Sequence, residues 1–288
     1  MEILKAQRTQ AKMKLGLLGP SGSGKTYSGL LMAYGITGAW DKIVVIDSEN
    51  GSSNLYAHLG DFNVIPISAP YSPEKYISAI HLAESSGMEV LIIDSISHEW
   101  ESQGGILDVH GSMAGNSFTN WSKVTPRHNA FVQAIVNSTC HIIGTIRSKQ
   151  DYVLTEKNGK HVPEKVGLKG VTREGMDYEF TCVLDLDIKH NAISSKDRTG
   201  LFADKPPFII TDSTGRKIRE WCEQGNNITD IVIQIQRSKS INALRELYHK
   251  YPEHQTELNN LFKEKKSMLE NELVTNELTL NTNENGDS

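Results

Sequence analysis

A phosphate-binding loop constrains the fold of this chain more than any other feature. Residues 19–26 read Gly-Pro-Ser-Gly-Ser-Gly-Lys-Thr, a complete match to the pattern G-x-x-x-x-G-K-[ST], and the apolar run 15–18 precedes them. A strand before this pattern and a helix after it form the setting in which it binds phosphates, because backbone N–H groups and the positive helix end converge there. The predicted nucleotide-binding residues are Gly19, Pro20, Ser21, Gly22, Ser23, Gly24, Lys25 and Thr26.

Two residues of the phosphate loop and an acid further along the chain indicate which ligands the site binds. Lys25 can reach the β- and γ-phosphates of ATP, and the Thr26 hydroxyl can bind Mg²⁺. Asp94 follows the apolar run 90–93, where a strand-ending acid is either a turn former or the second magnesium-binding group. Because the phosphate loop lies upstream, we favour the metal-binding role and expect ATP and Mg²⁺ as ligands.

Alternating apolar runs and helical stretches predict the fold class. The expected strands cover residues 15–18, 43–46, 62–67, 90–93, 141–146 and 178–186, with 192–195 as a hairpin partner of the last. The expected helices cover 26–34, 73–85 and a stretch that begins at Thr125-Pro126, while the glycine-containing segment 102–123 is expected to be a loop. This alternation predicts an α/β fold with a mainly parallel sheet sandwiched by helices.

The chain is expected to divide into three parts. Residues 1–225 form the predicted ATPase domain, residues 226–276 a small helical appendage, and residues 277–288 a disordered tail, because the tail is Asn-rich and has no basic residue.

Composition and residue pattern argue against several other classes of protein. With 38% hydrophobic and 23% charged residues, the 288-residue chain has a globular composition, and its formal net charge of −5 argues against indiscriminate coating of nucleic acid. No stretch approaches the roughly 20 apolar residues of a membrane span, and residues 1–13 lack an apolar signal core, so a cytoplasmic location is expected. The three cysteines have no C-x-x-C spacing, which argues against a disulfide framework or a zinc site.

Hydrolysis requires a carboxylate that orients and partly deprotonates the attacking water. Ser95 follows Asp94 at the position where many motor ATPases carry that glutamate. Glu49 lies just past the neighbouring apolar run 43–46 and is our expected catalytic base. Glu99 and Glu101 are competing candidates.

Several short motifs, taken in order, resemble those of RecA-type ATPases. Ile46-Asp47-Ser48-Glu49 resembles the strand that carries the catalytic glutamate in that family, and Ile93-Asp94-Ser95 resembles its second nucleotide motif. Residues 196–200, Lys-Asp-Arg-Thr-Gly, are similar to the Lys-x-Arg-x-Gly hairpin of RadA, KaiC and hexameric DnaB-type helicases. Over residues 14–225 the chain resembles phage and prophage AAA-type ATPases of RecA-like fold, some grouped with the Sak-type recombinases. Residues 93–100, 147–149, 165–167 and 173–180 carry this resemblance.

The resemblance implies a RecA-like ATPase of DNA recombination, replication or repair. It implies a homo-oligomer in which Lys196 and Arg198 reach into the neighbouring subunit's active site. Two residues apart on an extended segment, these side chains should point to the same side, and a positive finger of this kind can accelerate phosphoryl transfer by about 10³- to 10⁵-fold. The alternative is an ordinary solvated hairpin. Phage replication or single-strand-binding proteins are further expected partners.

A basic segment follows the strand 141–146. Residues 147–173 contain seven basic and three acidic residues, with an aromatic residue between them, and such a segment can track a phosphate backbone and stack on a base. RecA-type proteins carry a DNA-binding loop after the corresponding strand. The candidate single-stranded-DNA contacts are Lys149, Tyr152, Lys157, Lys160, Lys165 and Lys169. A solvated hairpin beside the ATP site is the alternative, and Arg147 could sense the γ-phosphate instead of DNA.

Two other functions remain open from the sequence. A nucleotide-gated loader would use ATP to control docking to a replication partner without binding DNA itself. A phosphate-loop kinase acting on a small molecule is less consistent with the sequence, because no arginine-rich lid is evident and the Lys-x-Arg-x-Gly segment would be unexplained.

Overall fold

The structure is a computed structural model that describes residues 8, 10–157, 160–225 and 228–284, of which the side chains of residues 150–168, 229, 253 and 272–284 are outside the description. The chain forms two compact units. The larger unit spans Lys12–Cys222, and the smaller one contains the described residues before Lys12 and after Cys222. The first unit therefore ends three residues before the predicted boundary. N-terminal residues join the second unit, where the Gln10 side chain donates to the Glu223 carbonyl oxygen at 3.3 Å.

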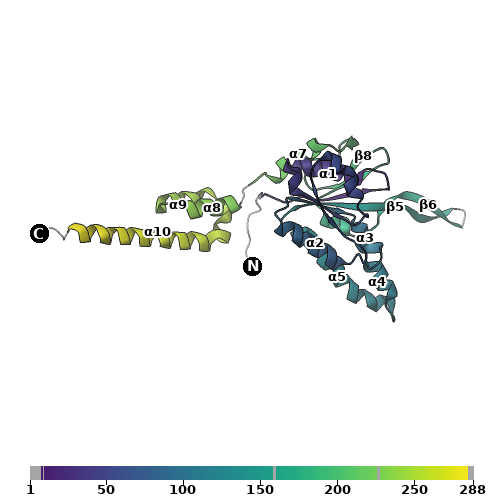
Figure 1. Cartoon of the computed structure of the whole chain (residues 1–288), viewed down its shortest axis with the longest axis horizontal. Helices are drawn as coiled ribbons and strands as arrows, with labels where there is room; N and C mark the ends of the chain where they lie inside the picture. The colour runs from purple at the N-terminus through teal and green to yellow at the C-terminus, as the bar shows by residue number, and fades with distance from the viewer. Residues whose placement is uncertain (1–7, 9, 158–159, 226–227, 285–288) are drawn as a thin grey trace. The chain divides into compact units, whose positions relative to one another are not determined.

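A twisted sheet forms the centre of the larger unit (Figure 1). In the described residues it has nine strands, in the order β3 (Asn63–Pro66), β2 (Ile43–Asp47), β4 (Val90–Asp94), β5 (His141–Lys157), β1 (Lys14–Gly19), β7 (Cys182–Leu186), β8 (Asn191–Asp197) and β9 (Phe208–Ile209), with β6 (Lys160–Gly170) paired to β5. The six strands from β3 to β7 are parallel, and β6, β8 and β9 pair antiparallel to their neighbours. The predicted α/β fold with a mainly parallel sheet is confirmed.

Helices cover both faces of this sheet, so its central strands are buried and mainly apolar. One face carries α1 (Lys25–Thr37) and α7 (Asp212–Cys222), and the other carries α2 (Pro73–Ser85) and α5 (Ser117–Asn137) (Figure 1). On the first face, Leu30 packs with Leu15 and other buried residues; on the second, Tyr76 and Phe131 pack with Ile93. The phosphate loop leaves the carboxyl edge of this sheet between β1 and α1.

The strand predicted over 141–146 is longer in the structure. β5 continues to Lys157 and pairs with β6 to form a long antiparallel hairpin that extends away from the sheet (Figure 1). The strand predicted over 178–186 is shorter: β7 begins at Cys182 instead of Tyr178, because residues Met176–Glu179 form the short helix α6.

The segment 102–123 was predicted to be a loop, and this prediction is wrong. It contains α4 (Ile106–Ser112) and the start of α5, while α3 (Ile96–Glu101) precedes it. The Asn116 side chain caps α5 by accepting a hydrogen bond from the Phe118 N–H at 2.8 Å. Pro126 therefore lies inside α5 instead of starting it. The glycines that suggested a loop, such as Gly104 and Gly115, lie in the connections, with φ of 78° and 97°.

The smaller unit is helical, as the sequence predicts. Its helices are α8 (Ile228–Arg237), α9 (Ile241–Lys250) and α10 (Gln255–Glu284), with the 3-10 turn η3 (Pro252–His254) before α10. Their core includes Ile235, Leu244, Leu258, Phe262 and Leu269. Of the predicted disordered tail, residues 277–284 belong to α10, and residues 285–288 lie outside the described residues; Glu and Leu residues within 277–280 are good helix formers. No helix of the described chain combines the length and apolar character that crossing a membrane requires.

Two glycines allow a close helix contact in the larger unit. The backbone of α1 at Gly35 lies against that of α7 at Gly215, and a Cβ atom on Gly35 would overlap the Asp212 carbonyl oxygen. Backbone atoms cannot swing away as a flexible side chain can, so a methyl group here must displace a helix.

We therefore expect Gly35→Ala to lower the free energy of unfolding by about 1–3 kcal/mol in urea denaturation. Gly111→Ala in α4 is the matched control, because, apart from its chain neighbours and the adjacent backbone of its own helix, no described atom lies within 4 Å of its added Cβ. Alanine is the better helix former, so the control should be unchanged or up to about 1 kcal/mol more stable. Equal stability of Gly35→Ala and the unmodified protein would contradict this explanation of the helix contact.

Candidate nucleotide site

The phosphate loop has the backbone shape that an anion site requires. It joins β1 at Gly19 to α1 at Lys25, and Gly22 and Gly24 have φ of 79° and 83°, a left-handed conformation that glycine adopts without strain. No side chain caps the start of α1. The first-turn N–H groups are thus left for a ligand, and the helix dipole favours an anion at this position.

The Lys25 ammonium is folded back onto the loop. Its Nζ donates to the carbonyl oxygens of Gly19 and Pro20, both at 2.9 Å. Partial burial lowers the pKa of Lys25, while the nearby carboxylates of Asp94 and Glu49 oppose this effect. The two current acceptors are neutral carbonyl oxygens, and a bond from the ammonium to a phosphate oxygen is stronger because both partners are then ionised.

Asp94 is buried at the end of β4 between two threonines. Its Oδ2 accepts a hydrogen bond from Thr26 Oγ1 at 2.6 Å, and its Oδ1 accepts one from Thr145 Oγ1 at 2.5 Å. Burial raises the pKa of Asp94, and the two hydroxyl donors oppose that rise. Sequence reasoning missed Thr145, because its contact with Asp94 depends on the pairing of β4 with β5, which no local pattern indicates.

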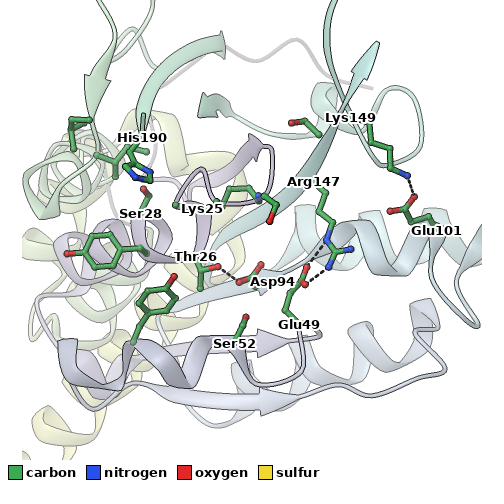
Figure 2. Close-up of a pocket in the computed structure, with 18 residues that line it drawn as sticks. Lys25, Thr26, Ser28, Glu49, Ser52, Asp94, Glu101, Arg147, Lys149 and His190 are labelled. Carbon is green, nitrogen blue, oxygen red and sulfur yellow. Dashed lines mark hydrogen bonds and ion pairs between the residues drawn. The ribbon is translucent and has the colours of Figure 1, made fainter. Parts of the chain in front are cut away.

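The Thr26–Asp94 pair fits a magnesium ion. It places a hydroxyl and a carboxylate oxygen side by side in the lining of the pocket (Figure 2). Mg²⁺ typically takes one or two protein oxygens and completes its octahedron with water and phosphate. In the described chain, no group of three or more His, Cys, Asp or Glu side chains could hold a metal ion.

Glu49 lies next to Asp94 but is engaged by other residues (Figure 2). Arg147 holds it in a two-pronged ion pair, with Nε donating to Oε1 at 2.9 Å and Nη2 donating to Oε2. The Ser95 hydroxyl donates to Oε1 at 2.9 Å, and His98 Nε2 lies 3.7 Å from the same oxygen. Burial alone would raise the pKa of Glu49, but the Arg147 hydrogen bonds, with help from His98 and Ser95, lower it overall. The carboxylate is therefore ionised and its oxygens are occupied.

Asp47 shapes the loop that presents Glu49. Its Oδ1 accepts from the N–H of Glu49 at 2.7 Å and from that of Gly51 at 3.3 Å. Its Oδ2 accepts from the N–H and hydroxyl of Ser53, at 3.0 and 2.5 Å, at the start of η2 (Ser52–Leu59). Sequence reasoning assigned no role to Asp47, although an acid before Ser-Glu-Asn-Gly is a signal of loop capping.

The competing acids lie in different surroundings. Glu99 is fully buried in α3, and both its oxygens are 3.1 Å from Nδ1 of His128 on α5, away from the pocket lining. Glu101 lines the pocket, but its Oε2 accepts from Lys149 Nζ at 2.6 Å. Of the three acids, only Glu49 lies beside the phosphate loop and Asp94, and its catalytic role stays a prediction.

These residues line a pocket of about 880 Å³, within the usual range for small-molecule sites. Figure 2 shows Glu49 and Arg147 toward one end and His190 and Ser28 at the other. The remaining wall includes apolar side chains: Tyr27 and Tyr56, whose ring centroids are 5.8 Å apart, together with Ile209 and Ile210. The pocket thus has a charged end suited to phosphates and a less charged end suited to a nucleoside.

The predicted finger residues lie outside this chain's own pocket. Lys196 Nζ donates to the carbonyl oxygens of Asp177 and Tyr178 at 2.8 and 2.6 Å, and Arg198 Nη2 donates to that of Tyr178 at 3.2 Å. Both side chains point to the same side, toward α6. Their action on a neighbouring subunit stays a prediction.

The structure places the candidate DNA residues on the hairpin of β5 and β6. Lys149 is paired with Glu101 near its base, and Lys169 is exposed. The side chains of Tyr152, Lys157, Lys160 and Lys165 lie outside the described residues. Contact with DNA stays a prediction.

Comparison with known proteins identifies the family. The family model described as "AAA domain" matches residues 11–209, which include the phosphate loop, Glu49, Asp94 and Arg147. A comparison with curated proteins finds no matching sequence. Because the family model covers more than half of the 288 residues, this chain belongs to the AAA domain family.

Proposed function

We propose that the protein is a magnesium-dependent ATPase. The observation that carries this proposal is the meeting of three groups in the lining of one pocket: the phosphate loop with Lys25, the Thr26–Asp94 oxygen pair, and Glu49 just past the adjacent strand end. Binding alone would require only the first two. An additional carboxylate beside them is the feature that hydrolysis needs.

In this proposal each group performs one task. Lys25 leaves the Gly19 and Pro20 carbonyl oxygens and binds the β- and γ-phosphates. Thr26 and Asp94 hold Mg²⁺, which when bound neutralises phosphate charge and orients the terminal phosphate. Glu49 accepts a proton from the attacking water. Tyr27, Tyr56 and Ile209 offer apolar surface to the base.

Arg147 connects ATP binding to the base. While Arg147 holds Glu49, the lowered pKa of the carboxylate makes it a weak proton acceptor. The terminal phosphate carries more charge than one carboxylate and competes for the guanidinium. Transfer of Arg147 to the phosphate would free Glu49 and raise its pKa, so the base becomes effective only with ATP in place.

We infer that the substrate polymer is single-stranded DNA and that the protein assembles with itself. The basic composition of residues 147–173, the projecting hairpin and the resemblance to phage and prophage recombination ATPases support the first inference. The position of Lys196 and Arg198 outside their own pocket supports the second. The proposed setting is DNA recombination, replication or repair in a phage or prophage.

Glu49→Gln should bind ATP nearly as tightly as the unmodified protein but turn it over about 10²- to 10⁴-fold more slowly, because the amide cannot accept the proton. Calorimetry with ATP and a steady-state phosphate-release assay measure the two quantities. Glu101→Gln is the matched control and should retain most activity. Unchanged turnover in Glu49→Gln, with loss in Glu99→Gln or Glu101→Gln, would show that the base is misassigned.

The finger residues can be tested by mixing two inactive proteins. A Lys196→Ala/Arg198→Ala variant should keep its nucleotide affinity and lose about 10³-fold in turnover, since only transition-state charge is left unpaired. Lys25→Ala lacks the lysine of the phosphate loop but keeps Lys196 and Arg198. Mixing the two should therefore restore part of the activity. No restoration, together with a monomer by light scattering in ATP, would exclude the subunit-bridging arrangement.

Labelled single-stranded oligonucleotides should bind in a fluorescence-anisotropy assay, with an affinity that falls as salt rises. Changing Lys157, Lys160, Lys165 and Lys169 to Ala should weaken binding and reduce the salt slope by about 0.7 for each phosphate that the variant no longer neutralises. A control with Lys205, Lys217, Lys239 and Lys263 changed to Ala should bind normally. If the unmodified protein binds no oligonucleotide, the loader function is favoured instead.

A further inference from the structure

The pocket contains a histidine in an uncommon backbone conformation. His190, in the turn between β7 and β8, has φ of 68°, in the left-handed region that few residues with a side chain adopt. Such residues persist where the surrounding structure determines them, and they cluster at ligand sites.

Asp187 fixes this turn without help from the imidazole. Its Oδ1 accepts from the N–H groups of Lys189 and Asn191 at 2.8 and 2.9 Å, and its Oδ2 accepts from Asn191 Nδ2 at 2.9 Å. The His190 N–H donates to the Asp187 carbonyl oxygen at 3.0 Å. In the described part of the chain, the His190 ring itself makes no hydrogen bond, so its two nitrogens contribute nothing to the turn.

The turn places the imidazole against the Gly24 backbone, in the lining of the pocket. Nδ1 lies 3.1 Å from the position that a Cβ atom on Gly24 would occupy, so the glycine permits this close approach. Figure 2 shows the ring beside Ser28, at the end of the pocket away from Glu49 and Arg147. Exposed apolar side chains share the pocket wall, with Tyr27 40% and Ile209 54% exposed.

The order of groups along the pocket indicates what the ring meets. The terminal phosphates are assigned to Lys25 and Arg147, and the next group of a nucleotide beyond its phosphates is the sugar, followed by the base. A neutral imidazole offers one donor, one acceptor and a flat face, which suit sugar hydroxyls and base edges. The His190 ring lies at the end of the pocket away from Glu49 and Arg147. The charge of the terminal phosphate is already matched at the Arg147 end.

We propose that His190 is a specificity-determining residue that binds the nucleoside part of the nucleotide and does not bind its phosphates. This inference rests on the proposed function, because it requires a nucleotide in the pocket. It assigns to the β7–β8 turn the task of distinguishing a nucleotide from an inorganic polyphosphate.

Calorimetry with Mg²⁺ and either ATP or inorganic tripolyphosphate tests this assignment. His190→Gly removes the ring and adopts the left-handed backbone freely, so its melting temperature should be unchanged or higher. We expect about a tenfold weaker affinity for ATP and an unchanged affinity for tripolyphosphate, with KM raised and kcat retained in turnover assays. His190→Asn also tolerates this backbone and keeps a donor and an acceptor, so its loss should be smaller. The neighbouring Lys189→Ala is the control and should match the unmodified protein.

Two results would overturn the inference. Equal weakening for ATP and tripolyphosphate would make His190 a phosphate ligand, and unchanged affinity for both would remove it from the site. Failure of the proposed function looks different. In that case the unmodified protein itself would bind neither ATP nor tripolyphosphate, and Lys25→Ala would not differ from it.

Discussion

The nucleotide site depends on one buried carboxylate and the groups that solvate it. Asp94 is removed from water, and a buried charge is costly unless hydrogen bonds replace its hydration. Thr26 from α1 and Thr145 from β5 supply them, while Ser48 at the end of β2 donates to the Asp94 carbonyl oxygen from its N–H at 2.7 Å. The hydrogen bonds that Asp94 accepts therefore bring the phosphate loop, two neighbouring strands and the Glu49 loop together around this residue.

In the proposed function, Glu49 and the terminal phosphate compete for the guanidinium of Arg147. This guanidinium is paired with Glu49 near the base of the β5–β6 hairpin, and Lys149, two residues further on, is paired with Glu101 in the pocket lining. Both cations belong to β5, and both acids belong to the wall of the nucleotide pocket. A ligand that competes for either cation would act directly on the strand that continues into the hairpin. In the proposed function, this strand is the physical connection between ATP and DNA.

The sequence predicted the features that depend on local pattern. Buried parallel strands are uniformly apolar, and the phosphate loop needs glycines at fixed spacing, so β2, β4, the loop and Asp94 could be located without a structure. Other features depend on tertiary contacts. The pairing of Arg147 with Glu49 joins residues 98 positions apart, and Thr145 is visible as a ligand of Asp94 only when β4 and β5 lie side by side. The glycines of 102–123 concealed α4 and the start of α5, because the same residues end helices and form loops.

The most direct test of the central claim is a crystal structure with Mg²⁺ and a non-hydrolysable ATP analogue. We predict that the metal lies on Thr26 and Asp94, that Arg147 has moved from Glu49 to the terminal phosphate, and that a water lies within hydrogen-bonding distance of the freed carboxylate. A bound analogue with Glu49 still paired to Arg147 and turned away from the terminal phosphate would contradict the claim.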